Sequence, residues 1–288
     1  MFRYDDTTST ANHRLYSRGG DNMSLPLNEI IHGDCLEVMR GWPSECIDLT
    51  VTSPPYDNLR TYNGFSFDFE GIAQELYRIT KPGGVVVWVV GDATVEGSET
   101  GVSFKQALYF KETGFNLHDT MIYLKSGFAY PSNNRYHQVF EYMFVFTKDN
   151  PKTFNPIMDH ENITKRRGGG KARDINGKMV DGGSGGLKLN KHGKRWNAWY
   201  YSVGGNKTTK DKMAYKHPAM FPEQLAHDHI ISWSNKGDVV LDPMCGSGTT
   251  CKMAMANNRN YIGVDISEEY CEIARKRIAE YQRQMSIV

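Results

Sequence analysis

Residues 238–254 read DVVLDPMCGSGTTCKMA and place an acid and a glycine loop between a strand pattern and a helix pattern. The apolar run ends at Asp242, and Gly246 and Gly248 follow just before the helical stretch. Glycines let a backbone approach a ligand closely, and the free N–H groups of a helix N-terminus bind anionic or polar groups. A second apolar run ends at Asp265, about twenty residues on, where nucleotide-binding folds place an acid that bonds the ribose hydroxyls. This order predicts a nucleotide-like cofactor site.

Outward from this stretch, short apolar runs alternate with stretches of helical period along most of the chain. Runs rich in β-branched and aromatic residues predict strands, and apolar residues at helical spacing predict helices. The predicted strands are 29–32, 47–51, 84–90, 118–124, 141–146, 238–242 and 260–266, and the predicted helices are 35–42, 69–80, 103–114, 222–234, 247–258 and 267–285. Ser267 is expected to cap the last helix. The alternation predicts an α/β fold with a mixed, mostly parallel sheet and helices on both faces.

The composition is that of an ordinary soluble protein, with 288 residues, 39% hydrophobic content, 23% charged content and a net charge of +1. Any nucleic-acid surface is therefore expected to be local. The five cysteines are scattered without a CxxC pair, which argues against a disulfide framework or a zinc knuckle. The nine histidines show no metal-ligand spacing, so we expect no metal. No signal peptide or membrane-length apolar segment is recognisable, and a cytoplasmic location is expected.

Residues 150–206 interrupt the alternation with a glycine-rich, basic segment. Between Lys165 and Arg195 the sequence holds ten Lys or Arg residues against two acids, Asp174 and Asp181. Cationic side chains neutralise phosphates, and base edges are read from elements that enter a groove. We therefore expect an insertion at 150–206 that contacts nucleic acid, between two halves of one domain at 25–149 and 207–288. A flexible arm is expected at 1–24.

A second unusual stretch, TSPPYDNL at 52–59, follows the predicted strand 47–51. The adjacent prolines fix two φ angles and offer no N–H, so they hold hydrogen-bond acceptors on a stiff frame. Tyr56 comes directly after them and presents a flat aromatic face. Taken alone, the pattern fits either a polyproline turn or a rigid corner that binds a ligand.

Several of these stretches resemble motifs of the amino-group DNA methyltransferases. LDPMCGSGTT is similar to the D-P-F-x-G-x-G-T loop that binds S-adenosylmethionine (AdoMet) in that family, although Met244 replaces the usual Phe. HPAMFPEQLAHDHI at 217–230, HGDCLEVM at 32–39 and KPGGVVVWVVGD at 81–92 are similar to three further family segments. The resemblance spans most of residues 29–281 and implies AdoMet as the cofactor. The cofactor ligands that it implies are Asp34, Pro218, Phe221, Asp242, Pro243, Cys245, Gly246, Ser247, Gly248, Thr249 and Asp265.

S-P-P-Y is the catalytic loop of that family, so the resemblance implies catalytic roles for Ser53, Pro54, Pro55 and Tyr56. The exocyclic amino nitrogen of a base is a poor nucleophile because its lone pair is delocalised into the ring. Acceptors for its N–H groups, here the Ser53 hydroxyl and the Pro54 carbonyl, localise that lone pair in a preorganised site. Tyr56 is expected to stack on a base extruded from the duplex.

The order of the motifs, with the catalytic loop before the AdoMet loop, resembles the beta group of the family. This order implies a circularly permuted Rossmann-like fold in which the last strands of the sequence lie beside the first ones. It also implies that the insertion is the target-recognition region. Release-factor glutamine methyltransferases have the opposite order, and the glycine spacing disfavours a Rossmann dehydrogenase. Methylation of cytosine C5 is disfavoured because no cysteine follows a proline.

The serine of S-P-P-Y and the longer pattern SPPYDNLRTY resemble cytosine-N4 enzymes, so transfer to cytosine N4 in duplex DNA is the favoured activity. Adenine N6 is the first alternative, and a catalytically inactive nucleic-acid-binding relative is the second. The expected DNA contacts are Arg60, Lys165, Arg166, Arg167, Lys171, Arg173, Lys194 and Arg195. A cognate restriction endonuclease is a further candidate partner, and the sequence is compatible with a monomer or a dimer.

Overall fold

The computed structural model describes residues 24–55, 67–128, 133–163, 171–181, 190–204, 207–209, 211, 213–214 and 221–285. The first half forms β1 (Glu29–His32), α1 (Cys35–Arg40), β2 (Ile47–Thr52), α2 (Phe69–Ile79), β3 (Thr80–Val90), β4 (Thr94–Val95), β5 (Ser98–Glu99), α3 (Val102–Glu112), β6 (Asn116–Lys125) and β7 (Phe140–Thr147). The second half forms β8 (His160–Glu161), β9 (Lys171–Arg173), β10 (Met179–Asp181), β11 (His192–Gly193), β12 (Ala198–Tyr201), α4 (Glu223–Trp233), β13 (Val239–Asp242), α5 (Thr249–Ala256), β14 (Asn260–Asp265) and α6 (Glu268–Met285). Each helix and strand expected from the sequence is confirmed, with ends that shift by a few residues.

One eight-stranded sheet organises these elements, in the order β1-β14-β13-β2-β3-β7-β6-β12. Only β7 runs antiparallel to its neighbours β3 and β6, and every other adjacent pair in this sheet is parallel. The expected mixed, mostly parallel α/β fold is therefore confirmed. β13 pairs with β2, so a strand from the end of the chain lies next to one from its beginning, as the order of the motifs implied.

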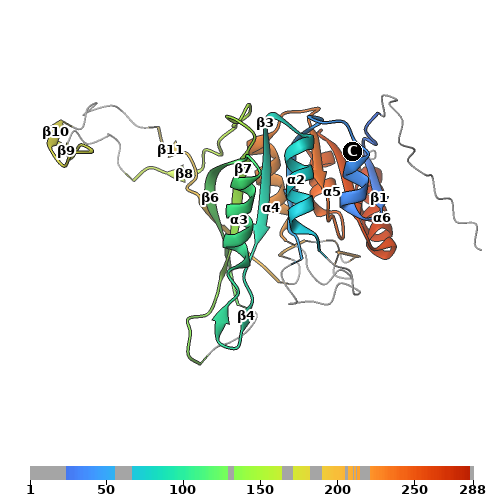
Figure 1. Ribbon diagram of the computed structural model, residues 1–288, viewed down its shortest axis with the longest axis horizontal. Helices are drawn as coiled ribbons and strands as arrows, with labels where there is room; N and C mark the ends of the chain where they lie inside the picture. Colours follow the sequence, from blue (N-terminus) through green and yellow to red (C-terminus); the bar gives the residue numbers. More distant parts are fainter. Residues whose placement is uncertain are drawn as a thin grey trace, which may run out of the picture.

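Helices cover both faces of the sheet (Figure 1). β3 shows why, because its side chains alternate between two buried cores. Val85, Val87 and Val89 pack in the core that α4, α5 and α6 share, while Val86, Trp88 and Val90 pack in the core under α1, α2 and α3. Burying one such apolar side chain contributes about 1.5–3 kcal/mol. A central strand that is apolar on both faces is typical of a sheet enclosed by helices.

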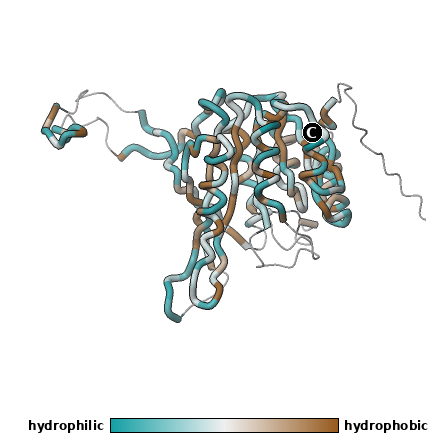
Figure 2. Tube along the Cα trace, in the orientation of Figure 1, coloured by the Kyte–Doolittle hydropathy of each residue, from teal (hydrophilic) through white to brown (hydrophobic). Residues whose placement is uncertain are grey.

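The described strands of the expected insertion, residues 150–206, pair in three separate places. β8 pairs with β11, and β9 pairs with β10 in a two-stranded ribbon that stands clear of the main sheet in Figure 1. β12 instead pairs in parallel with β6 and becomes the edge of the main sheet. Hydrophobic and hydrophilic residues are mixed along the projecting part of the insertion, whereas the central strand β3 is hydrophobic along most of its length (Figure 2). No helix within the described ranges is both long and apolar enough to span a membrane.

His229 of α4 is an uncommon buried group in the core beneath the sheet. Its side chain is fully buried, and its ring lies 4.6 Å from the ring of Trp199 and 3.2 Å, at Nε2, from the sulfur of Met143. Burial disfavours the charged imidazolium and lowers the pKa of His229 to about 3. The histidine therefore stays neutral in the folded protein at pH values where an unfolded chain would protonate it.

This burial predicts acid-dependent stability. Between about pH 6.5, where an unfolded histidine takes up its proton, and the folded pKa of about 3, the unfolded state binds more protons. The free energy of unfolding should consequently fall as the pH is lowered through this interval. Urea unfolding at several pH values should show a shallower pH slope for His229→Leu than for the unchanged protein. His118→Leu, at an exposed histidine of β6, is the matched control and should keep the full slope. Equal slopes for all three proteins would contradict the assignment.

Candidate active site

The predicted catalytic corner begins where β2 ends, in the middle of the sheet. Ser53 and Pro54 follow directly after Thr52, with Pro54 buried and Ser53 half-buried; Pro55 comes next. β2 lies between β13 and β3, and the carboxyl ends of these three parallel strands share one edge. Ligands of open α/β sheets bind outside this edge. Tyr56 and Arg60 lie outside the described residues.

Two buried hydrogen bonds join this corner to the glycine loop after β13. The Thr52 hydroxyl donates to Oδ1 of Asp242 at 2.8 Å, across 190 positions of sequence. In the opposite direction, the Thr250 hydroxyl of α5 donates to the carbonyl oxygen of Val51 at 3.0 Å. Because both bonds are shielded from water, each fixes the relative position of the two strand ends. The structure thereby brings the two strongest motifs of the sequence together.

The glycine loop is also held from the side of β14. The Cys245 N–H donates to the Val264 carbonyl at 2.8 Å, and the Gly246 N–H donates to the Asp265 carboxylate at 2.8 Å. Gly248 has a φ of 76°, and a Cβ atom there would lie 2.7 Å from the Cβ of Ala274, so both conformation and packing require glycine. The loop and β14 together assemble Asp242, Pro243, Cys245, Gly246, Ser247, Gly248, Thr249 and Asp265, all expected from the sequence.

The two acids of this assembly are poised to accept further hydrogen bonds. Burial raises the pKa of Asp242 to about 6, although the hydroxyl of Thr52 and the N–H of Met244 oppose the shift. Burial also raises the pKa of Asp265, against the N–H groups of Ser267 and Gly246. Additional donors would stabilise both carboxylates. Ribose hydroxyls and an ammonium group are such donors, so these residues fit a nucleoside cofactor with an amino-acid tail.

The remaining predicted cofactor residues lie near this edge with different surroundings. The Asp34 carboxylate caps α1 by accepting hydrogen bonds from the N–H groups of Leu36 at 2.8 Å and Glu37 at 3.1 Å. β1, which ends two residues before Asp34, pairs with β14, and this places Asp34 near the end of the strand that carries Asp265. Phe221 is half-buried against the core under α4. Pro218 lies outside the described residues.

Arg277 braces the loop from behind, and the sequence reasoning missed it. Its guanidinium is fully buried and donates to Asp211 at 2.6 Å, to Glu223 at 2.9 Å, and to both the carbonyl and the hydroxyl of Ser247. Lys252 adds a second cation by pairing with Glu223 at 2.8 Å. Asp211 and Glu223 flank the H-P-A-M-F-P segment, so Arg277 joins both flanks of that segment to the loop.

A signal for Arg277 was present in the helical period. Cys271, Ala274 and Ile278 form the buried stripe of α6, and Arg277 lies beside this stripe. A cation at an apolar position of an amphipathic helix implies a buried carboxylate partner. The sequence does not tell which carboxylate, because Asp211 and Glu223 are 66 and 54 positions away.

The expected DNA contacts divide between exposed and internally paired cations. Lys171 and Arg173 are exposed on β9, and Lys194 is exposed with its ammonium 5.4 Å from the ring centre of Phe154. Arg195 is half-buried instead and pairs with Asp159 and Asp228, each at 2.5 Å. Lys165, Arg166 and Arg167 lie outside the described residues. These pairings assign Arg195 an internal structural role, and its contact with DNA stays a prediction that the ion pairs disfavour.

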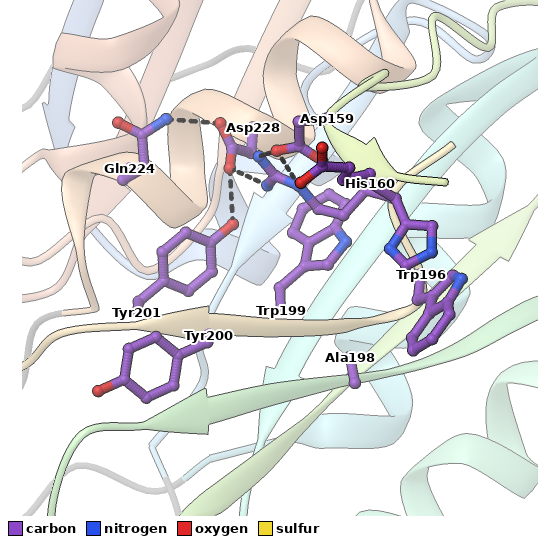
Figure 3. A pocket seen from close by; sticks show the side chains of 11 residues that line it. Asp159, His160, Trp196, Ala198, Trp199, Tyr200, Tyr201, Gln224 and Asp228 are labelled. Carbon is purple, nitrogen blue, oxygen red and sulfur yellow. Dashed lines mark hydrogen bonds and ion pairs between the residues drawn. The ribbon is translucent and has the colours of Figure 1, made fainter. Parts of the chain in front are cut away.

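The carboxylate of Asp228 anchors the base of the insertion to α4. It accepts hydrogen bonds from Arg195, from the Tyr201 hydroxyl at 2.8 Å and from Gln224 at 2.6 Å. Figure 3 shows the side chains of Tyr201 and Gln224 directed toward Asp228. Burial raises the pKa of Asp228, but His227 and these three donors outweigh that effect and lower the pKa to about 2. A cavity of about 500 Å³ lies beside this cluster, lined by residues of β8, β12 and α4, and it includes none of the predicted cofactor ligands. Among the described residues, no three His, Cys, Asp or Glu side chains gather as a metal site.

Similarity to known proteins identifies the family of this chain. A family model described as DNA methylase, for N6- and N4-methyltransferases, matches residues 47–276. The chain belongs to this DNA methylase family. It is 60% identical over 238 residues to the orphan methyltransferase M.BamHII of Bacillus amyloliquefaciens, in a match that covers 82% of this chain and 89% of that relative.

Two solved structures share the fold. The PvuII DNA methyltransferase, described as cytosine-N4-specific, is 21% identical with a TM-score of 0.63, covering 88% of this chain and 91% of the other. The putative DNA modification methylase TTHA0409 of Thermus thermophilus, complexed with S-adenosyl-L-methionine, is 23% identical with a TM-score of 0.58, covering 88% and 95%. Enzymes of this DNA methylase family use AdoMet, so the chain is an AdoMet-dependent DNA amino-methyltransferase.

The contacts of Arg277 with the glycine loop predict that a substitution of Arg277 selectively weakens cofactor binding. Arg277→Met removes the donors that hold Ser247 and leaves Asp211 and Glu223 short of a cation, which costs stability as well as loop position. Calorimetric titration should show AdoMet affinity lowered about tenfold or more, while affinity for duplex DNA changes little. Lys276→Met is the matched control, because Lys276 is the exposed neighbour on α6 and pairs only with Glu272 among the described residues. A folded Arg277→Met protein with unchanged AdoMet affinity would contradict the role.

Proposed function

We propose that this chain is a site-specific DNA methyltransferase that transfers a methyl group from AdoMet to the exocyclic N4 of a cytosine extruded from duplex DNA. The observation that carries this proposal is the hydrogen bond between Thr52, which precedes Ser53, and Asp242, which opens the glycine loop. This bond joins the acceptor-rich corner to the glycine loop at adjacent strand ends, which supports the proposal. Transfer between a cofactor and a base needs this adjacency.

The catalytic corner would act on the amino group of the base. AdoMet, when bound, supplies an electrophilic methyl group on a sulfonium. The Ser53 hydroxyl and the Pro54 carbonyl would accept the two amino N–H groups and draw the lone pair out of conjugation toward that methyl group. The new nitrogen–carbon bond would replace the sulfonium–carbon bond of AdoMet, and the amino nitrogen would then release one proton to solvent. No base is needed to remove a proton before transfer.

The cofactor would lie along the glycine loop. Asp265, at the end of β14, is suited to the ribose hydroxyls, and the buried Asp242 and the loop N–H groups are suited to the amino-acid end. Asp34 would face the adenine side, and Phe221, Pro218 and the segment between them would cover the methionine side, as the family resemblance implies. Tyr56 would stack on the extruded base.

The choice of cytosine rests on the serine of S-P-P-Y and on the pattern SPPYDNLRTY. Adenine N6 is the alternative target, because the matching family model covers both N6 and N4 methylases. The sequence disfavours the inactive nucleic-acid-binding alternative, because it keeps Ser53, Tyr56, Asp242 and Asp265. A cognate restriction endonuclease is a candidate partner as well, although the 60% identical relative M.BamHII is described as an orphan methyltransferase.

The product of the reaction tests this proposal directly. The protein should be incubated with AdoMet and duplex DNA of mixed sequence, and the DNA digested to nucleosides for mass spectrometry. We expect N4-methylcytosine, and Tyr56→Ala should form far less product while it still binds AdoMet. N6-methyladenine as the only product would overturn the base assignment, and absence of any methylated nucleoside would overturn the proposed activity.

A further inference from the structure

The β9–β10 ribbon, residues 171–181, is a small projecting element with a firmly built tip. Met179 pairs with Arg173 and Asp181 with Lys171 across two antiparallel strands. At the turn, one carboxylate oxygen of Asp174 accepts the N–H groups of Asn176 at 2.9 Å and Lys178 at 2.8 Å. The Arg173 guanidinium closes the same turn by donating to the Gly177 carbonyl at 2.9 Å. The tip is thus preorganised rather than a loose loop.

This firm turn displays an apolar residue. Ile175, at the tip, is 101% exposed, and Met179 and Val180 on β10 are 49% and 39% exposed. Figure 2 shows hydrophobic residues in this ribbon although it stands clear of both cores. An isolated two-stranded hairpin is marginally stable in water. A built turn that holds a large apolar side chain outward is therefore suited to burial against a partner.

The cations around the tip indicate the charge of that partner. Lys171, Arg173 and Lys178 are all exposed on the ribbon, and one of its two acids, Asp174, is engaged in the turn. The wider stretch from Lys165 to Arg195, which we name the basic arm, carries ten Lys or Arg residues and two Asp residues, a net charge of +8 (10 − 2). The partner should therefore be a polyanion with an apolar interior.

We propose that the β9–β10 ribbon enters a groove of the duplex DNA substrate tip first, with Ile175 buried against the bases and the flanking cations on the phosphates. This inference rests on the proposed function and names the element that grips its substrate. The major groove admits a two-stranded ribbon, and architectural proteins insert apolar side chains between base steps. A second copy of the chain fits less well, because two basic arms would repel each other.

The test uses the full-length protein with a matched pair of variants. Ile175→Ser removes the apolar tip without changing charge, and Ile163→Ser makes the same change at an isoleucine of the insertion that is 97% exposed and lies outside the ribbon. Ile175→Ser should raise the dissociation constant for duplex DNA about 10- to 100-fold, the loss expected for one fully buried isoleucine. AdoMet affinity and thermal stability should stay unchanged, and Ile163→Ser should bind DNA like the unchanged protein.

A second variant tests the cations. Replacing Lys171, Arg173 and Lys178 together by Gln should make DNA affinity less dependent on salt, because fewer phosphates are then neutralised by the protein. The logarithmic slope should fall by about 0.9 for each phosphate that one of these cations neutralises in the unchanged protein. A steep slope retained in this variant would contradict the phosphate contacts.

The outcomes separate this proposal from the proposed function. If the unchanged protein methylates DNA and Ile175→Ser binds and methylates it equally well, the ribbon proposal is overturned while the methyltransferase assignment stands. If Ile175→Ser instead alters self-association in sedimentation and leaves DNA affinity intact, the tip serves a protein interface, which also overturns the proposal. If the unchanged protein yields no methylated nucleoside, the proposed function fails, and direct DNA binding by the two isoleucine variants still decides the role of the ribbon.

Discussion

The hydrogen bond from Thr52 to Asp242 is the contact on which the rest of the site depends. It joins the last residue of β2 to the last residue of β13, at the centre of the sheet and away from water. A buried carboxylate loses solvation and must recover hydrogen bonds from the protein. The Thr52 hydroxyl and the Met244 N–H supply these hydrogen bonds. The buried Asp242 carboxylate is therefore stabilised only while Thr52, next to the predicted catalytic corner, stays in place. The strand end that leads into the proposed base-binding corner is therefore coupled to the proposed cofactor loop.

Buried charged groups also hold the back of the glycine loop and the base of the insertion. Arg277 joins the loop to Asp211 and Glu223, and Asp228 joins the base of the insertion to α4. Both Glu223 and Asp228 belong to α4, one at its first residue and one in its middle. One helix therefore holds the glycine loop at one end and the base of the insertion along its side. Because α4 packs on the sheet, the glycine loop and the base of the insertion are fixed to the same core.

Local pattern was enough to predict the described helices and every strand of the main sheet except β12, and the motif order predicted that β13 would lie beside β2. Hydrophobic periodicity and secondary-structure propensity are properties of short sequence windows, so they predict elements such as α2 and β3 well. Three features escaped because they depend on distant partners. The sequence of β12 looks like an ordinary aromatic stretch. Only its pairing with β6 makes β12 the edge strand of the sheet. Arg277 needed carboxylates from two other segments, and Arg195 looked like a phosphate ligand until Asp159 and Asp228 were placed against it.

The most direct test of the coupling between corner and loop is the single-turnover rate of methyl transfer in Thr52→Val, at saturating AdoMet and DNA. β2 supplies its own control, since Thr50 is equally buried and its hydroxyl has no hydrogen-bond partner among the described residues. The account predicts that Thr52→Val slows transfer about tenfold or more, because small displacements of reacting groups are costly, while Thr50→Val transfers like the unchanged protein. Equal rates for the two folded variants would contradict it.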